Sequence, residues 1–274
     1  ILNLSSDVKT AGIAARHAGI PRIIYRRGSA IPVRKSPLNY YLFRYVITDV
    51  IVNSEETKRT INAGRTPLAP NNKIHLFYNG LRFGQLEKMP PKRYYQKQGD
   101  EIVIGNLGRI VHQKAQHYLV DVALQLRAEG IHFKILIGGE GELKPQLEEQ
   151  IRKHKLGPYF HLVGFVDNVK GFMQSIDIYV HTALWEGFGY VIAEALYFER
   201  PVVAFRVSSN PEVIADKHTG LLAAFRNVQE LYAHTRTLAL SPGLRLQYGK
   251  NARQYVTTHF DFHKNLEKLK AFLF

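Results

Sequence analysis

The sequence predicts an α/β fold with parallel β-sheets, helical connections and two domains. Short runs of β-branched and aromatic residues alternate with longer segments in which apolar residues have helical spacing. This alternation is typical of parallel strands joined by crossover helices. Residues 86–100 are polar, contain prolines and follow neither pattern, which is typical of an interdomain linker.

The first part of the chain is expected to form a sheet with few strands. Ile1 to Ser6 resembles a strand entered at its middle, and the first residue is isoleucine rather than methionine. A doubly wound sheet normally has strands on both sides of its switch point. We therefore expect an incomplete N-terminal domain at 1–88, in a chain that is a fragment. Its expected strands are 22–25, 49–53 and 74–78, and its expected helices are 8–17 and 55–62.

The second part is expected to form a larger domain. After a linker at 89–99, residues 100–258 hold at least five strand candidates, among them 175–181 and 201–204. The last segment, 259–274, has helical spacing of apolar residues, and its narrow apolar face favours packing over a position on a membrane surface. Helices are expected at 116–129, 142–153 and 228–240.

Composition excludes several kinds of site. The chain has 274 residues and no cysteine, which rules out disulfides, thiolate metal sites and cysteine nucleophiles. It has no uninterrupted apolar run of the roughly 20 residues that span a bilayer. We therefore expect a cytoplasmic location, with the inner face of the cytoplasmic membrane as a candidate contact.

Positive charge is concentrated in the first domain. Residues 1–99 hold 17 Lys and Arg against 5 Asp and Glu, whereas the rest of the chain is nearly balanced; the whole carries +14. Such a field favours anionic partners, namely nucleic acid, acidic lipid headgroups or phosphorylated glycans. Alternatively, the excess only keeps the protein soluble.

Two glutamates and two glycines form the most informative motif. Glu186 and Glu194 bracket Gly187 and Gly189, between the strand candidate at 175–181 and an apolar, helix-like stretch. A loop that ends at a helix N-terminus presents unpaired backbone N–H groups and a positive dipole end. The segment is therefore suited to an anionic or hydroxyl-rich ligand that approaches the glycines closely.

This segment resembles the Glu-x7-Glu signature of the retaining glycosyltransferases of family 4, the glycosyl transferases group 1. Further segments follow in that family's order over roughly residues 79–223. The resemblance implies a GT-B fold, in which two Rossmann-like domains face a cleft. It assigns 100–258 to the nucleotide-sugar donor and returns the helix at 259–274 to the acceptor-side N-terminal domain. The matching segments are 102–114, 133–141, 161–166, 210–215 and 219–223.

The resemblance gives catalytic roles to Arg109, Lys114 and Glu186. Arg109 and Lys114 would bind the diphosphate, whose charge grows as the glycosidic bond breaks. Glu186 would hold hydroxyls of the donor sugar without acting as a nucleophile, since the family is thought to use a front-face displacement. The alternative is that both cations are ordinary solvated surface residues.

Other residues are expected to bind the donor. Glu194 would accept hydrogen bonds from the ribose hydroxyls. The alternative for Glu186 and Glu194 is that they only cap a helix N-terminus, and Phe165 is equally compatible with a place in the core. The full donor-binding set is Gly108, Gly164, Phe165, Val166, Gly187, Phe188, Gly189 and Glu194, with Gly164 to Val166 against the base.

The sequence departs from the family at two places. Arg26 and Arg27 stand before Gly28, where many members place a histidine before a glycine. A guanidinium binds phosphate or carboxylate and cannot serve as a base, so these arginines predict an acidic acceptor. Ala115 follows Lys114 where glycine is common, and we expect this replacement to have little effect.

Neither a metal nor another cofactor is expected. The chain contains no Asp-x-Asp, the usual metal-binding signature of the other major glycosyltransferase fold. His259 and His263 stand four apart and would share one helix face as zinc ligands do, but no third ligand is evident. An ordinary packed or surface pair is the favoured interpretation.

The sequence therefore predicts a retaining, metal-independent hexosyltransferase of polysaccharide or lipopolysaccharide biosynthesis. It would transfer sugar from a nucleotide-diphosphate sugar to an anionic cell-envelope glycan or lipid-linked acceptor, with contact to an anionic membrane surface and none to nucleic acid. Two alternatives remain. A nucleotide-sugar epimerase of the same fold would convert the donor without an acceptor. A non-catalytic fragment would bind nucleotide or polyanion without turnover.

Overall fold

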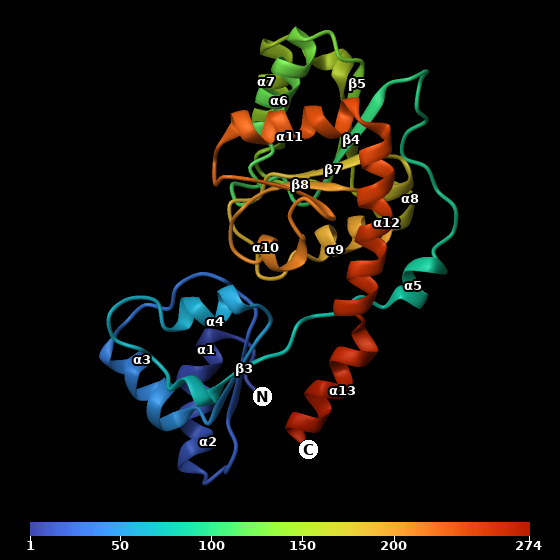
Figure 1. Ribbon diagram of the computed structural model, residues 1–274. Coiled ribbons are helices and arrows are strands. Elements are labelled where there is room, and N and C mark those ends of the chain that lie inside the picture. Colours follow the sequence, from blue (N-terminus) through green and yellow to red (C-terminus); the bar gives the residue numbers. More distant parts are fainter. The chain divides into compact units, whose positions relative to one another are not determined.

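The computed structural model describes residues 1–274, which form two compact units. Unit 1 consists of Ile1–Asn79, Glu186–Phe188 and Lys264–Phe274, and unit 2 consists of Gly80–Trp185 and Gly189–His263. Both contain parallel sheets with helical connections, so the predicted α/β class is confirmed (Figure 1).

Unit 1 contains a three-stranded parallel sheet in the order β1-β2-β3. Of the strand expected at Ile1 to Ser6, the structure has only one parallel bridge, from Leu2 to Tyr25 on β1, and Ser5 begins a helix. The strands are β1 (Ile24–Arg27), β2 (Asp49–Val52) and β3 (Ile74–Leu76). The helical segments are α1 (Ser5–Asp7), η1 (Val8–Gly12), α2 (Ile13–His17), α3 (Pro37–Tyr41), η2 (Leu42–Val46), α4 (Glu55–Ile61), η3 (Asn71–Lys73) and α13 (Phe262–Leu273).

Local sequence explains how these helices begin and how the last one is held. Ser36 and Ser54 precede α3 and α4, and each side chain accepts a hydrogen bond from a backbone N–H of the first turn. At the other end of the chain, Arg22 donates to the carbonyl oxygens of Phe272 (2.9 Å) and Leu273 (2.8 Å). A cation at a helix C-terminus pairs with carbonyls that have no partner within the helix.

Unit 2 contains a six-stranded parallel sheet in the order β6-β5-β4-β7-β8-β9. Figure 1 shows this sheet between α6 and α11 on one side and α9 and α10 on the other. The strands are β4 (Ile102–Leu107), β5 (Phe133–Gly138), β6 (Phe160–Gly164), β7 (Ile178–His181), β8 (Val202–Phe205) and β9 (Gly220–Ala223). The helical segments are α5 (Phe83–Glu87), α6 (His117–Ala128), α7 (Lys144–Lys153), η4 (Gly157–Tyr159), α8 (Val169–Gln174), α9 (Tyr190–Tyr197), α10 (Asn210–Val213), α11 (Val228–Leu240) and α12 (Pro242–His259).

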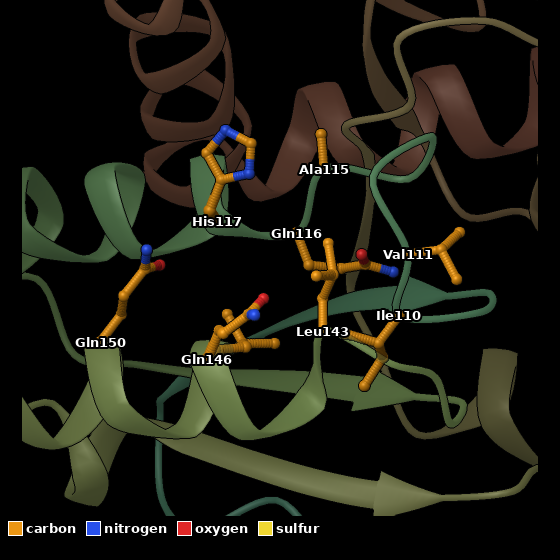
Figure 2. A pocket seen from close by; sticks show the side chains of 9 residues that line it. Ile110, Val111, Ala115, Gln116, His117, Leu143, Gln146 and Gln150 are labelled. Carbon is orange, nitrogen blue, oxygen red and sulfur yellow. The ribbon is translucent and has the colours of Figure 1, made fainter.

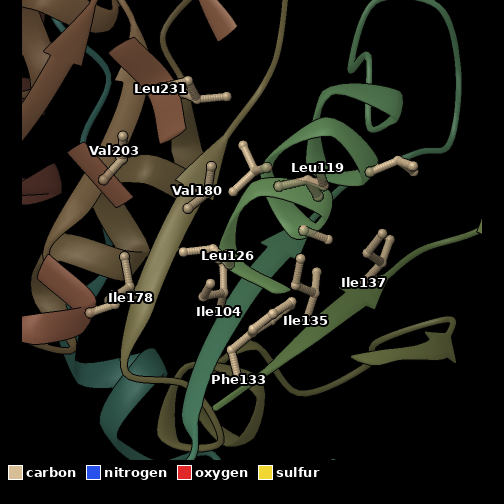
Figure 3. Packing of buried hydrophobic residues seen from close by; sticks show 14 of the residues in the cluster. Ile104, Leu119, Leu126, Phe133, Ile135, Ile137, Ile178, Val180, Val203 and Leu231 are labelled. Carbon is tan, nitrogen blue, oxygen red and sulfur yellow. The ribbon is translucent and has the colours of Figure 1, made fainter. Parts of the chain in front are cut away.

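The core of unit 2 lies between the sheet and its helices. Strands β4, β5, β7 and β8 are buried along nearly their whole length, as expected for a parallel sheet covered on both faces. Figure 3 shows Leu119 and Leu126 of α6 packed toward Ile104, Ile135 and Ile178 of three adjacent strands. This packing fixes the carboxyl ends of the strands, from which the candidate site is built.

The predicted helices lie within a few residues of the observed ones, whereas three other predictions differ from the structure. The strand expected at 22–25 is β1, two residues later. The segment expected as a linker at 89–99 has no helix or strand, yet it is bonded to unit 2: Tyr94 N donates to Ser175 Oγ (3.0 Å), and Asn168 Nδ2 donates to the carbonyl of Pro90 (2.8 Å). The division between units lies at Asn79, before the expected boundary at 88.

Candidate functional site

The candidate donor site lies at the switch point of the sheet in unit 2. Strand order reverses between β4 and β7, which are neighbours in the sheet although three helices and two strands separate them along the chain. Open α/β sheets bind ligands at this position, beyond the carboxyl ends of the strands. The loops after β4 and β7 carry most of the predicted donor residues.

Glycines allow the loops after β4 and β5 to approach each other at the backbone. A Cβ on Gly139, which has φ +131°, would lie 2.0 Å from the carbonyl oxygen of Gly108, and one on Gly141 would lie 2.2 Å from that of Ile110. Hydrogen bonds join the same segments, from Gly108 N to Gly138 O and from Ile110 N to Glu140 O, both 2.9 Å. Only glycine fits at 139 and 141.

Arg109 and Lys114 lie in the loop that these contacts hold. Arg109 is exposed, and its carbonyl accepts a hydrogen bond from Gln116 Nε2 (3.0 Å). Lys114 is half-buried, with its aliphatic stem 3.3 to 3.7 Å from the position of a Cβ on Gly108. Lys114 is therefore not an ordinary solvated surface cation.

The loop after β7 is bonded to the loop after β4. Thr182 Oγ1 donates to the carbonyl of Lys114 (2.6 Å), and Gln113 Nε2 donates to the carbonyl of Trp185 (2.8 Å). The backbone of Leu184 also donates to Gln113 O (2.8 Å). The structure thus brings the lysine loop and the start of the glutamate motif together at the switch point.

Ala115 has a left-handed backbone conformation, with φ +48°, and is buried. Such a conformation costs an L-residue with a Cβ roughly 1–2 kcal/mol. Alanine at this position therefore has a backbone cost that glycine would not have. The alanine stores strain next to Lys114.

Glu194 is a half-buried carboxyl inside α9 rather than a cap. It lies beyond the first turn of the helix, and that turn contains no acidic residue. The N-cap residue is Gly189, which has no side chain that could cap the helix. Its carboxylate has no hydrogen bond or ion pair, and burial raises the pKa of Glu194 from its ordinary 4.5 to about 7. A titratable group perturbed by burial at the end of a sheet is a candidate ligand contact.

Glu186 and the two residues after it belong to a separate part of the structure. Glu186 is 8% exposed, Phe188 is buried and Gly187 is half-buried, and all three group with unit 1, whereas Gly189 groups with unit 2. Burial of Glu186 also argues against a solvated helix cap. Gly189 has φ +83°, the left-handed conformation that starts α9 and that glycine adopts without strain.

The segment after β6 presents Phe165 to solvent. Its side chain is 79% exposed, which excludes the alternative that it belongs to the core. Gly164 has φ +77° and its carbonyl accepts a hydrogen bond from Gly139 N (2.6 Å), while Val166 packs toward Gly138. A flat aromatic side chain thus stands at the same edge of the sheet as the loops after β4 and β5.

Arg26 and Arg27 lie at the end of β1 in unit 1. Arg26 is exposed, whereas Arg27 is half-buried and donates to Tyr25 Oη (3.4 Å) and to the carbonyl of Ile31. Nε of Arg27 is buried without a hydrogen-bond partner. Both arginines are in unit 1, whereas Arg109, Lys114 and Glu194 are in unit 2.

A buried polar cluster behind the switch point was missed by the sequence analysis. Asn106 Nδ2 donates to the carbonyl of Val180 (2.7 Å), and Tyr179 Oη donates to the carbonyl of Leu107 (3.1 Å). Oη of Tyr179 also lies 3.3 Å from Nδ1 of His181. These bonds tie β4 to β7 at the strand ends. The polar residues within apolar strands were the available signal.

A small pocket beside the site contains none of the predicted site residues. It has a volume of about 100 Å³ and lies between the loop after β4, the start of α6 and α7. Figure 2 shows Gln146 and Gln150 of α7 on one side of it and Gln116 and His117 on the other. Burial lowers the pKa of His117, which favours a neutral imidazole at the rim of this pocket.

The histidine pair does not have the predicted arrangement. α12 ends at His259 and α13 begins at Phe262, so His259 and His263 lie on different helices. Within the segment 259–274, His259 ends α12 and one helix, α13, covers Phe262–Leu273. No group of three or more His, Asp or Glu side chains in residues 1–274 has the arrangement of a metal site. None of the helices has the length and apolar character required to span a bilayer.

Known proteins are similar to this chain in both sequence and fold. The family described as Glycosyl transferases group 1 matches residues 91–255. The chain is 27% identical over 242 residues to an uncharacterized glycosyltransferase of Methanocaldococcus jannaschii, covering 86% of this chain and 63% of that protein. It is 26% identical over 235 residues to the capsular polysaccharide biosynthesis glycosyltransferase CapM of Staphylococcus aureus, covering 83% and 61%.

A solved structure matches nearly the whole chain. Anabaena Alr3699/HepE in complex with UDP gives a TM-score of 0.83 at 21% identity, with 98% of this chain and 76% of that chain covered. The complex of the same protein with UDP-glucose gives a TM-score of 0.79. The chain spans 44% to 63% of the length of the first three curated relatives. Because the family match covers more than half of the chain and the fold agrees, the protein belongs to the glycosyl transferases group 1 and has a GT-B-type fold.

Proposed function

We propose that this chain acts in a retaining glycosyltransferase that transfers a sugar from a nucleotide-diphosphate sugar to a cell-envelope glycan. The observation that carries the proposal is the switch point of unit 2, where Arg109, Lys114 and Glu194 with a raised pKa occur on linked elements. Membership of the family and the UDP and UDP-glucose complexes of HepE support a nucleotide-sugar donor.

The proposed chemistry stabilises the leaving diphosphate with fixed cations. Arg109 and Lys114 would bind its oxygens, and their charges would act most strongly as the glycosidic bond breaks. Glu194 would accept hydrogen bonds from ribose hydroxyls, and Phe165 would contact the base. Glu186 would orient the donor sugar. In the proposed front-face displacement, the leaving phosphate takes the proton of the acceptor hydroxyl, without a metal.

An anionic cell-envelope acceptor is proposed for unit 1. CapM supports a capsular polysaccharide or a related envelope glycan as the acceptor class. The basic excess of residues 1–99, together with Arg26 and Arg27, favours an acceptor that carries phosphate or carboxylate. Lipopolysaccharide core and lipid-linked glycans belong to this class.

Contact with an anionic membrane surface is proposed for the same unit. Leu38, Tyr41 and Tyr45 follow helical spacing over α3 and η2, and all three are exposed, Tyr45 to 65%. Aromatic side chains beside basic residues suit the headgroup region. The test is sedimentation with anionic and zwitterionic vesicles: Tyr41→Ser with Tyr45→Ser should reduce binding to anionic vesicles, and equal binding to both vesicle types would contradict the contact.

Calorimetric titration with UDP, GDP and ADP in EDTA tests the donor site, followed by transfer assays with their sugar conjugates. We expect micromolar binding of one nucleotide and its loss in Lys114→Ala. Lys250→Ala, which removes an exposed lysine of unit 2, should bind normally.

The transfer assay separates this proposal from the alternatives. Turnover that requires a glycan acceptor and retains the anomeric configuration supports it. Conversion of the donor without an acceptor would identify an epimerase instead. Nucleotide binding without turnover, with any acceptor tried, would identify a binding fragment.

A further inference from the structure

A larger pocket lies wholly within unit 1, at the carboxyl end of β1. It has a volume of about 230 Å³ and is formed by residues of α1, η1, β1, α3, η2 and the segment 32–34. The carboxyl ends of parallel strands are where open α/β sheets bind ligands. The pocket therefore occupies a position in which a ligand is expected.

Three cations and no carboxylate line this pocket. They are Lys9, Arg27 and Arg34. Lys9 and Arg34 are exposed, and neither side chain makes a hydrogen bond or ion pair. The carboxylate closest to them in sequence, Asp7, instead accepts hydrogen bonds from Leu4 N (3.0 Å) and Ser6 Oγ (3.3 Å). None of the three cations forms an ion pair with a carboxylate of the chain, so their charge is available to an anionic ligand.

Arg27 is held in the wall of the pocket with one donor unpaired. Its guanidinium donates to Tyr25 Oη and to the carbonyl of Ile31, while Nε is buried and has no partner. A buried donor without an acceptor costs about 1–3 kcal/mol. An oxyanion in the pocket would supply an acceptor, and the planar guanidinium favours phosphate and carboxylate oxygens.

The remainder of the wall is largely apolar. The rings of Tyr25 and Phe43 pack edge to face with centroids 6.0 Å apart, and Val8 and Leu42 are buried beside them. An apolar surface next to a cluster of cations suits a ligand whose charged group is attached to carbon atoms. An isolated inorganic anion would leave this surface uncovered.

We propose that this pocket binds a phosphate group carried on a polyol or sugar, as the anionic part of the acceptor. A phosphate monoester carries about two negative charges at neutral pH and matches three cations better than a single carboxylate does. The assignment of the ligand as an acceptor rests on the proposed function, whereas the binding of phosphate does not. Val8, Leu42 and the two rings would contact the carbon frame.

The test is calorimetric titration of the full chain with glycerol 3-phosphate, inorganic phosphate and glucuronate at fixed ionic strength. We expect glycerol 3-phosphate to bind more tightly than inorganic phosphate and glucuronate. Lys9→Ala and Arg34→Ala should each weaken its binding by about tenfold or more, the size of a charge-assisted hydrogen bond. Arg16→Ala changes the charge of the same unit equally but lies outside the pocket, and should weaken binding less than twofold.

Three results would overturn the inference. One is the absence of binding by any of the anions, and another is an Arg16→Ala effect as large as that of Lys9→Ala. The third is tighter binding of glucuronate, which would assign the pocket to a carboxylate. UDP affinity should not change in Lys9→Ala and Arg34→Ala. If the wild-type chain binds glycerol 3-phosphate but not UDP, the donor site is refuted and this pocket is not. Lys9→Gln and Arg34→Gln repeat the test if an alanine variant fails to fold.

Discussion

Replacement of Glu194 by glutamine should stabilise the protein above neutral pH. Burial raises the pKa of Glu194 from 4.5 to about 7, so between these values the folded chain holds a proton that the unfolded chain releases. Glu194 therefore lowers the free energy of unfolding by nothing below pH 4.5, and it lowers that free energy increasingly as the pH rises toward 7. Glutamine has no charge to bury and removes this penalty.

The size of the effect follows from the shift. Each pKa unit corresponds to about 1.4 kcal/mol, so ionising Glu194 in the folded state costs on the order of 3 kcal/mol at pH 8 and below 1 kcal/mol at pH 5. The stability gain of Glu194→Gln should thus grow by about 2 kcal/mol between these pH values. In a domain of this length, each kcal/mol shifts the midpoint of thermal unfolding by roughly 2–4 °C.

Denaturant unfolding of the wild type and the variant at pH 5 and pH 8 measures this difference directly. Glu148→Gln is the matched control, because Glu148 is an exposed carboxylate of unit 2 without a hydrogen-bond partner. A gain that is the same at both pH values, or a Glu194→Gln variant that is less stable than the wild type at pH 8, would refute the reasoning.

Four further predictions concern the donor site. UDP affinity in the wild type should rise about tenfold from pH 6 to pH 8, because the ionised Glu194 is the better hydrogen-bond acceptor, and this rise should be smaller in Glu194→Gln; equal pH profiles in titration calorimetry would contradict the ribose contact. Lys114→Ala should lower kcat/KM of the transfer reaction by about 100- to 1000-fold, as for other fixed groups that stabilise transition-state charge; a loss below tenfold in steady-state kinetics would exclude contact with the leaving phosphate. Ala115→Gly should be neutral or stabilising by up to about 1 kcal/mol, since it relieves strain, whereas Ala123→Gly within α6 should destabilise by about 1 kcal/mol; equal losses in urea unfolding would show that Ala115 is unstrained. Phe165→Ala should leave stability unchanged but weaken UDP binding by about tenfold, the scale of one base–aromatic contact; unchanged affinity would remove Phe165 from the site.

The sequence predicted the fold of unit 2 well because its signals are local and strong. Buried parallel strands appear as short runs of β-branched residues, and the helix over Val228–Leu240 was predicted with its observed bounds. The family resemblance and the GT-B-type fold were confirmed by the match to residues 91–255 and by the solved structures. The retaining mechanism, the individual site residues and the absence of a metal remain predictions.

Other features depended on contacts that sequence periodicity does not encode. The segment 89–99 has the composition of a linker, yet Pro90 and Tyr94 are bonded to unit 2 by residues more than 70 positions away. The helix expected at 259–274 begins instead at Phe262, because the backbone of Leu81 exchanges hydrogen bonds with Phe260 and Phe262 between α12 and α13. Long-range hydrogen bonds decide both outcomes.

Within the site, the sequence identified residue types but not their environments. It placed Glu194 on a helix after a glycine, but only the packing around α9 removes much of its solvation and raises its pKa. Phe165 was ambiguous for the opposite reason, since an aromatic residue after a strand is usually buried. The close backbone approach of Gly139 to Gly108 was not predicted, because φ and backbone proximity are properties of the folded chain.

Hydrogen exchange with and without UDP, measured by mass spectrometry in EDTA, tests the position of the donor site most directly. The central claim is that nucleotide binds at the carboxyl ends of β4, β5, β6 and β7. It predicts slower exchange on UDP addition in residues 108–116, 138–141, 164–166 and 189–194. Slower exchange confined to α7, or to unit 1, would contradict it.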